Sequence, residues 1–251
     1  MIANYHTHTK RCRHASGSDR EYVESAIKAG VDVLGFSDHA PYLFKNKNYY
    51  SSYRMFIDQI EDYRDSVLAL KKEYEKDIRI LFGFELEYYK ETHKEEMAFL
   101  SKYNPEYIIL GQHYVRSETL SNYAMFDQDE EFLKDYVNEC IEGIKTGDFI
   151  YLAHPDICGY NFDKNVLEQE YTRLLKCCKE YDMPIEINVL GIITNRHYPN
   201  AKIFKMAKEI GNKVIIGLDA HSPNQISKHA FELARGIARQ AGVEVIEKLD
   251  I

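Results

Sequence analysis

Histidine and carboxylate residues recur at regular positions in this chain of 251 residues, which contains ten histidines. His6 and His8 are two residues apart in an extended segment, so their side chains point to the same side. Asp219 and His221 repeat this spacing near the other end of the chain. Imidazole and carboxylate groups placed in this way hold divalent metals in hydrolytic enzymes. The spacing therefore predicts a metal centre that draws on both ends of the sequence.

Further polar side chains stand at or just after the ends of short apolar runs. Glu85 closes one such run, where an ionised carboxylate would be costly to bury unless it were paired or coordinated to a metal. Single histidines at such places are usually ordinary, but here every apolar run supplies at least one imidazole, carboxylate or amide. In chain order the groups are His6 and His8, Asp38 and His39, Glu85 and Glu87, Gln112 and His113, His154 and Asp156, Glu186 and Asn188, and Asp219 and His221.

The apolar runs are short and do not alternate with polar residues, which is typical of strands buried on both faces. They are Ile2–Tyr5, Val33–Phe36, Ile78–Phe84, Tyr107–Leu110, Phe149–Ala153, Pro184–Val189 and Val214–Leu218. Their alternation with amphipathic stretches indicates an α/β fold with parallel strands. In a closed parallel barrel all strands end at one mouth, which would gather the polar groups there.

Helices are expected between these runs. Ser18 and Glu21 form a capping-box pattern that begins one helix, and Gly30 is placed to end it. The other predicted helices cover roughly Tyr53–Tyr74, Asp129–Lys145, Val166–Tyr181, Asn200–Ile210 and Gln225–Ala241. The interval Tyr42–Ser52 has no clear element, and we expect a loop there that lies over the site.

Composition narrows the class of protein. Asp and Glu number 40 against 32 Lys and Arg, a net charge of −8 without a basic arm, which argues against a nucleic-acid partner. The apolar runs are too short to cross a membrane. Five cysteines without a CxxC pair predict no disulfide framework and a cytoplasmic location. With no linker-like stretch, we expect a single domain over residues 1–251.

The motifs together resemble those of the PHP (polymerase and histidinol phosphatase) superfamily of metal-dependent phosphoesterases. The resemblance covers nearly the whole chain through His6-Thr-His8, Ser37-Asp-His39, His154-Pro-Asp156 and Asp219-Ala-His221, with Glu85 and His113 between them. The sequences of residues 4–17, 35–42 and 83–88 are similar to those of the histidinol-phosphate phosphatase branch. This resemblance implies a distorted, TIM-like (β/α)7 barrel whose C-terminal mouth holds up to three divalent ions.

The resemblance also implies the ligand sets. One ion would be held by His6, His8, Glu85 and Asp219, and a second would share Glu85 and add His113 and His154. The third would be held by His14, His39 and His221, of which His14 is indicated by the resemblance alone. Nitrogen and oxygen ligands of this kind accept zinc, manganese or iron, and the sequence does not choose among them.

The implied reaction is hydrolysis of L-histidinol phosphate to L-histidinol and phosphate, a step of histidine biosynthesis, by a metal-bridging hydroxide. Glu85, Asp219, His221 and Asp156 are the expected catalytic residues. Arg196 is our candidate for binding the phosphate, with Arg116 weaker, and His197 is either a substrate contact or an ordinary loop residue. Asp38, Glu87 and Asp156 are alternatives for orienting the histidines or protonating the leaving group.

Two other functions remain open at this stage. One is a PHP phosphoesterase that acts on another phosphomonoester or on nucleic-acid ends, although a nuclease should carry a basic track for the nucleic-acid backbone. A metal-binding regulatory module without turnover would fit the same barrel. The complete set of ligand residues argues against such a loss of activity.

Overall fold

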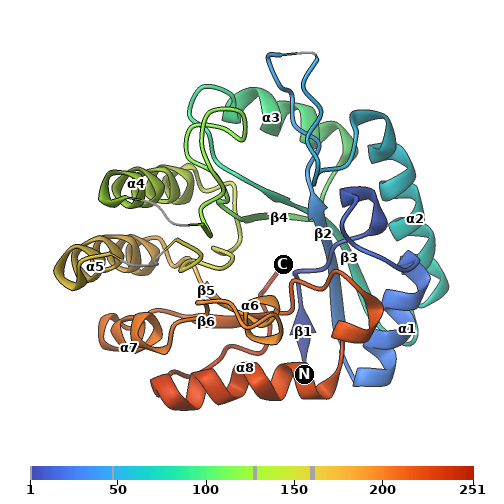
Figure 1. The fold of residues 1–251 in the computed structure, drawn as a ribbon. Coiled ribbons are helices and arrows are strands. Elements are labelled where there is room, and N and C mark those ends of the chain that lie inside the picture. Colours follow the sequence, from blue (N-terminus) through green and yellow to red (C-terminus); the bar gives the residue numbers. More distant parts are fainter. Residues whose placement is uncertain (1, 47, 127–128, 159–161) are drawn as a thin grey trace.

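Four parallel strands form a curled sheet at the centre of the computed structural model, which describes residues 2–46, 48–126, 129–158 and 162–251 (Figure 1). Their order in the sheet follows the chain: β1 (Ala3–Asn4), β2 (Val33–His39), β3 (Arg79–Leu86) and β4 (Tyr107–Leu110). The β2–β3 ladder is the longest, and its last pair places His39 beside Glu85. The parallel α/β class predicted from the sequence is confirmed in this half-barrel.

The second half of the chain adds a two-stranded parallel sheet, β5 (Ile185–Asn188) with β6 (Val214–Gly217). Isolated parallel bridges link the two sheets: Leu152 pairs with Leu110 of β4 and also with Ile185 of β5. A further bridge between Thr7 and Ala220 brings the start of the chain beside the end of β6.

The prediction of a strand over Phe149–Ala153 was wrong. Only Leu152 is paired in this segment, as an isolated bridge. The Leu152 N–H donates to the Pro184 carbonyl and the Ala153 N–H to the Leu110 carbonyl, so the segment still lies between its neighbours. The Glu186 N–H completes the bridge by donating to the Leu152 carbonyl at 3.0 Å, but Pro184 has no N–H with which to extend the pairing toward the start of the segment.

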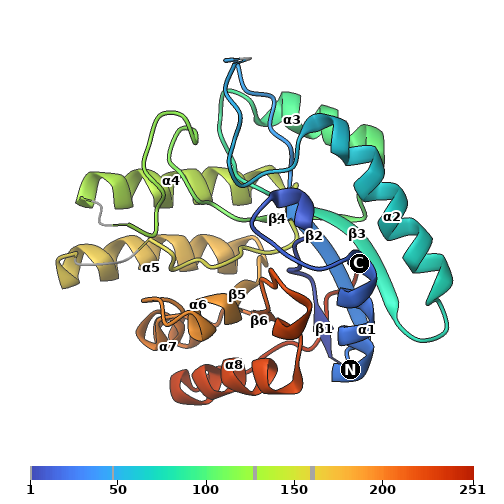
Figure 2. The same cartoon turned by 45° about the vertical axis from the view of Figure 1, so that its right-hand side comes forward.

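Helices surround the strands, with α1 and α2 on one side, α4 and α5 on the opposite side, and α8 below (Figures 1 and 2). The capping box at Ser18 and the left-handed cap at Gly30 are both present, so the predicted ends of the first helix are confirmed. The helices are α1 (Asp19–Ala29), α2 (Ile60–Glu73), α3 (His93–Leu100), α4 (Glu130–Thr146), α5 (Lys164–Glu180), α6 (Val189–Ile193), α7 (Ala201–Ile210) and α8 (Lys228–Ala241).

The predicted helices differ from the structure in two places. The helix expected from Tyr53 begins only at Ile60, after a 3-10 turn over Ile57–Gln59, because Tyr53 and Arg54 turn toward the interior and make polar contacts there. The helix α3 was not predicted from its charged sequence. His93, although it lies in a charged stretch of sequence, is buried at the start of α3, and its Nε2 lies 2.7 Å from Asp148.

All five cysteines are free and buried. Within the described ranges, none of the helices combines the length and the apolar character needed to cross a lipid bilayer.

Candidate metal centre

The carboxylate of Glu85, at the end of β3, lies at the centre of a cluster of buried histidines. Its Oε2 atom is 3.0 Å from His39 Nδ1, 3.4 Å from His6 Nε2 and 3.5 Å from His8 Nε2. Glu85 and these three histidines are all buried. The run of aromatic and aliphatic residues before Glu85 packs into the core, which fixes the carboxylate at the sheet edge.

The other oxygen of Glu85 faces a second pair of histidines. Oε1 is 2.9 Å from His154 Nε2 and 3.5 Å from His113 Nε2. Glu85 therefore stands between two groups of imidazoles, one on each oxygen. Each carboxylate oxygen is thus within reach of a different set of imidazole donors.

Asp219 supplies the second carboxylate of the cluster, just after β6. Its Oδ1 lies 3.0 Å from His8 Nε2 and 3.5 Å from His6 Nε2, while Oδ2 accepts a hydrogen bond from the Asn188 side chain. The backbone of Asp219 has φ 51° and that of His154 has φ 27°, left-handed conformations that cost energy for residues other than glycine. Such strain is characteristic of functional sites.

His14 and His221 meet at the rim of the cluster, with their Nε2 atoms 2.8 Å apart. Each ring donates its Nδ1 proton to a backbone carbonyl, that of Cys12 for His14 and that of Asp219 for His221. Burial lowers the pKa of both rings, that of His221 to about 3, and the nearby His8 adds to this. The Nε2 lone pairs of two neutral rings thus face each other. A cation bound between them would remove the repulsion.

In three other histidines, the Nδ1 atom lies next to an acidic side chain. His6 Nδ1 lies 2.9 Å from Glu186, and His113 Nδ1 lies 2.9 Å from Glu87. The contact of His8 Nδ1 with Asp38 is longer, at 3.4 Å. Carboxylates in this position fix the orientation of ligand histidines and raise their basicity. They leave Nε2 of each ring directed toward the centre.

The donor atoms of the cluster fit divalent cations. His6 Nε2, His8 Nε2, His39 Nδ1 and Glu85 Oε2 are buried and lie 3.0–3.5 Å from one another or from Asp219, but none of them makes a well-aligned hydrogen bond within the described residues. Buried polar atoms are normally satisfied, so unpaired imidazole and carboxylate atoms this close together fit a bound cation. Imidazole nitrogen and carboxylate oxygen suit zinc, manganese and iron.

The electrostatics keep the two central carboxylates ionised. Burial acts to raise the pKa of Glu85, but His6, His39 and His113 outweigh it and hold the pKa well below its ordinary value. The same balance, with His6 and His8 as the main partners, lowers the pKa of Asp219. Anionic carboxylates at the centre are the form that binds metal.

Two glycines make room for the acidic side chains. A Cβ atom on Gly111 would lie 1.9 Å from Glu85 Oε1, and one on Gly217 would lie 1.4 Å from Glu186 Oε1. No other residue type fits at either position without moving a carboxylate.

A cavity of about 430 Å³ opens over the cluster. Arg196 lies at its wall, where its Nη1 donates to the Tyr198 hydroxyl at 2.6 Å. Aromatic side chains form much of the remaining wall, which the sequence analysis did not predict. The lining residues are His14, His39, Tyr53, His113, Tyr114, Tyr123, Met125, Phe126, His154, Leu190, Arg196, Tyr198, Asp219 and His221.

Three predicted site residues lie away from this cavity wall. Arg116 is exposed on the surface and pairs with Asp135 at 3.0 Å. His197 is half-buried, with Nε2 2.8 Å from the Ile157 carbonyl. Asp156 is buried and accepts from the Asn200 N–H, and burial raises its pKa to about 7. The structure thus brings Arg196 to the cluster but not Arg116.

Of the three acidic residues considered for orienting histidines, Asp38 and Glu87 contact ligand-type rings as described above. Glu186 takes the same place beside His6, although its sequence context was equally consistent with a substrate contact or an interior polar group. In the sequence, only the position of Glu186 in the sixth apolar run, two residues before Asn188, marked it as a candidate. That position does not distinguish a residue that orients a histidine from a substrate contact or an interior polar group.

Comparison with known proteins places this arrangement in a family. The family model described as the PHP domain matches residues 4–189. The histidinol-phosphatase of Bacillus subtilis is 33% identical over 259 residues, covering 90% of this chain and 96% of that protein. A probable histidinol-phosphatase of Deinococcus radiodurans is 25% identical and covers 90% of this chain and 88% of its own length.

Solved structures show the same fold. The histidinol phosphate phosphatase of Lactococcus lactis, complexed with zinc, L-histidinol and phosphate, has a TM-score of 0.73 at 17% identity, covering 98% of this chain and 95% of that one. A protein described as a putative histidinol phosphatase from Listeria monocytogenes has a TM-score of 0.75 at 21% identity. The match covers 92% of this chain and 99% of that one. With its motifs and its metal-ligand geometry, the chain belongs to the PHP domain family.

Proposed function

We propose that this protein is a histidinol-phosphatase, which hydrolyses L-histidinol phosphate to L-histidinol and inorganic phosphate. The observation that carries the proposal is the convergence of nine expected ligand residues beneath one cavity. They are His6, His8, His14, His39, Glu85, His113, His154, Asp219 and His221. The relative from Bacillus subtilis, which matches along nearly its whole length, supports the choice of substrate.

We further propose three divalent ions at this centre, distributed as the sequence resemblance implies. His6, His8 and Asp219 would hold the first, His113 and His154 the second, with Glu85 shared between them, and His14, His39 and His221 the third. When bound, such ions supply a water of lowered pKa as nucleophile and neutralise the phosphoryl oxygens. The two lone pairs facing each other at His14 and His221 support the third position.

The protein's own residues bind and orient the phosphate. Arg196 lies at the wall of the same cavity as the histidines, and its guanidinium is steadied by the Tyr198 hydroxyl and ring. A guanidinium presents paired N–H donors that match phosphate oxygens. The aromatic side chains around the opening limit water access and offer flat surfaces for the organic part of the substrate.

The architecture supports a closed barrel made of one domain. The bridges at Leu152 and between Thr7 and Ala220 connect all seven predicted runs in chain order, so we propose a distorted (β/α)7 barrel over residues 1–251. The five free thiols are in keeping with a cytoplasmic enzyme of histidine biosynthesis.

Substrate preference tests the proposed activity. Phosphate release is measured from L-histidinol phosphate, p-nitrophenyl phosphate and a nucleoside monophosphate, with the metal content determined on the same sample. We expect kcat/KM for histidinol phosphate to exceed the others by at least a hundredfold. Equal turnover of the other esters would leave a PHP phosphoesterase and refute the histidinol assignment.

A further inference from the structure

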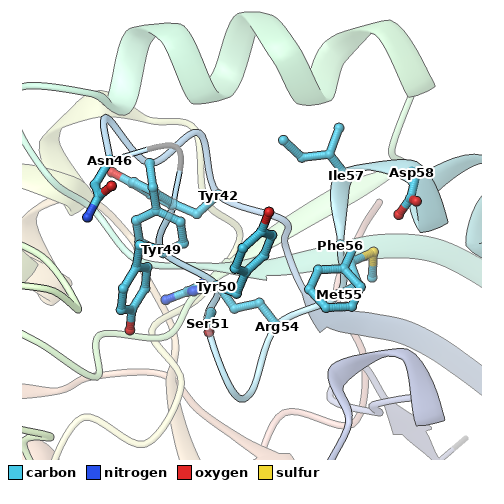
Figure 3. Close-up of a pocket in the computed structure, with 11 residues that line it drawn as sticks. Tyr42, Asn46, Tyr49, Tyr50, Ser51, Arg54, Met55, Phe56, Ile57 and Asp58 are labelled. Atoms are coloured by element: carbon cyan, nitrogen blue, oxygen red, sulfur yellow. The ribbon is translucent and has the colours of Figure 1, made fainter.

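Arg54 is a fully buried arginine that no motif indicated. It is 1% exposed and lies in the irregular segment before α2, where it lines a second cavity of about 520 Å³ (Figure 3). A buried guanidinium needs carboxylate partners, because its desolvation is costly. Arg54 has two: Nη2 lies 2.5 Å from Glu87 and Nε lies 2.9 Å from Glu118.

The first partner leads directly to the metal centre. The Oε1 atom of Glu87 that accepts from Arg54 also lies 2.9 Å from His113 Nδ1. Tyr53 donates its hydroxyl proton to the same oxygen at 3.2 Å, and Arg54 Nη2 donates to that hydroxyl at 2.8 Å. The position of Glu87 is thus determined jointly by Arg54, Tyr53 and His113.

The second partner lies in the segment after β4. Glu118 accepts from Arg54 on one oxygen and from the Tyr49 hydroxyl on the other, at 2.7 Å. Arg54 therefore ties three segments together: the segment from Tyr42 to Phe56, the end of β3 through Glu87, and the loop that carries His113 and Glu118. One planar side chain makes these contacts at different nitrogens, which a lysine ammonium cannot reproduce.

We propose that Arg54 is a positioning residue of the metal centre. It holds Glu87 in the place where that carboxylate orients His113, and so directs His113 Nε2 toward Glu85 and the metal position between them. The inference rests on the proposed metal centre, but not on the identity of the substrate. Without Arg54, the buried Glu87 carboxylate would keep only the Tyr53 hydroxyl and His113 Nδ1 of these partners, and it would be free to turn away from His113.

Zinc affinity tests the proposal, measured by competition with a chromophoric chelator on the full-length protein. We expect Arg54→Met to weaken the affinity at the position that His113 serves by about ten- to a hundredfold, the range found for residues that orient metal ligands. Arg54→Lys, which keeps the charge but not the planar fork, should fall between this variant and the wild type.

The control is Arg173→Met, which also removes an arginine from a buried carboxylate, Glu170, on α5 away from the cluster. Its zinc affinity should equal that of the wild type even if its melting temperature falls. Glu118→Gln keeps the pairing of Arg54 with Glu87 and should also retain wild-type affinity.

Wild-type zinc affinity in folded Arg54→Met would overturn the proposal. If that variant fails to fold, wild-type affinity in Arg54→Lys overturns it instead. An equal loss of affinity in Arg173→Met would show a general effect of stability and refute a positioning role. A wild-type protein that binds zinc but does not hydrolyse histidinol phosphate would refute the proposed function alone, whereas one that binds no zinc refutes both.

Discussion

Glu85 depends on the absence of a side chain at Gly111. An alanine Cβ there would lie 1.9 Å from Glu85 Oε1, a distance that no real contact allows. We expect Gly111→Ala to displace the carboxylate, release metal and lower kcat at least a hundredfold, because two of the three proposed ions share Glu85. Metal content and phosphate release measured on the same preparation check this expectation.

Gly236 provides the matched control. It lies within α8, and a Cβ there would meet only the end of Arg239 at 4.0 Å. Gly236→Ala should leave activity and metal content unchanged and raise stability by up to about 1 kcal/mol, since alanine is the better helix former. Unchanged metal content in Gly111→Ala would contradict the bridging position of Glu85.

Arg196 and Arg116 were both candidates for binding phosphate, and the structure separates them. Arg196→Ala should lower kcat/KM by about ten- to a hundredfold, the loss expected for a hydrogen bond to a charged group of about 1.5–3 kcal/mol, with metal content intact. Arg116→Ala removes only a surface ion pair with Asp135 and should be without effect. Identical kinetics for the two variants would remove Arg196 from phosphate binding.

At the scale of elements, strand ends were the most predictable feature. Residues such as His39, Glu85 and Asp219 follow apolar runs, and parallel strands carry whatever follows them to one edge. Arg54 and Tyr53 were not predictable in this way. Their segment had helical propensity, and contacts with Glu87, which is 33 residues further along the chain than Arg54, decided its conformation instead.

Helix α3 holds the base of the Tyr42–Ser52 segment through Glu96, whose Oε1 accepts from the Leu43 N–H at 2.7 Å. Glu96 is 1% exposed, and burial raises its pKa from 4.5 to about 7, with the Leu43 hydrogen bond opposing the shift. The folded state therefore binds the proton more tightly than the unfolded state. This carboxyl makes the protein less stable as pH rises from 4.5 to 7, by about 3 kcal/mol in total.

Replacement of the Glu96 carboxyl by an amide removes the cost of ionising a buried carboxylic acid. Glu96→Gln should raise the free energy of unfolding by up to about 3 kcal/mol at pH 8 and have little effect near pH 4.5. Denaturant unfolding at the two pH values measures both. The neighbouring Glu95 is exposed and is only a minor cause of the raised pKa of Glu96, so Glu95→Gln should change the free energy of unfolding far less at either pH. A gain in Glu96→Gln that is equal at both pH values would refute the buried-acid explanation.

At the scale of the whole molecule, the metal centre connects the two ends of the sequence. His6 and His8 lie against Asp219 and His221, and the bridge from Thr7 to Ala220 runs between them. The alternation of runs and helices predicted this arrangement in outline. The weak pairing around Leu152 was not predictable, because it depends on where Pro184 falls opposite it.

Removal of metal should therefore destabilise the whole fold. A ligand at a hundred times its dissociation constant stabilises the native state by about 2.7 kcal/mol. For a chain of this size that corresponds to a melting temperature higher by about 5–10 °C. Thermal melts of chelator-treated protein with and without added zinc or manganese measure the shift, and identical melts would contradict a structural role for the ions.

The most direct test of the central claim is anomalous diffraction from crystals of the metal-loaded protein, recorded on both sides of the absorption edges of zinc, manganese and iron. We predict three peaks within the cluster: one between His6 and Asp219, one between His113 and His154, and one between His14 and His221. Density at these positions from fewer than three ions, or peaks only elsewhere on the molecule, would contradict the trinuclear centre.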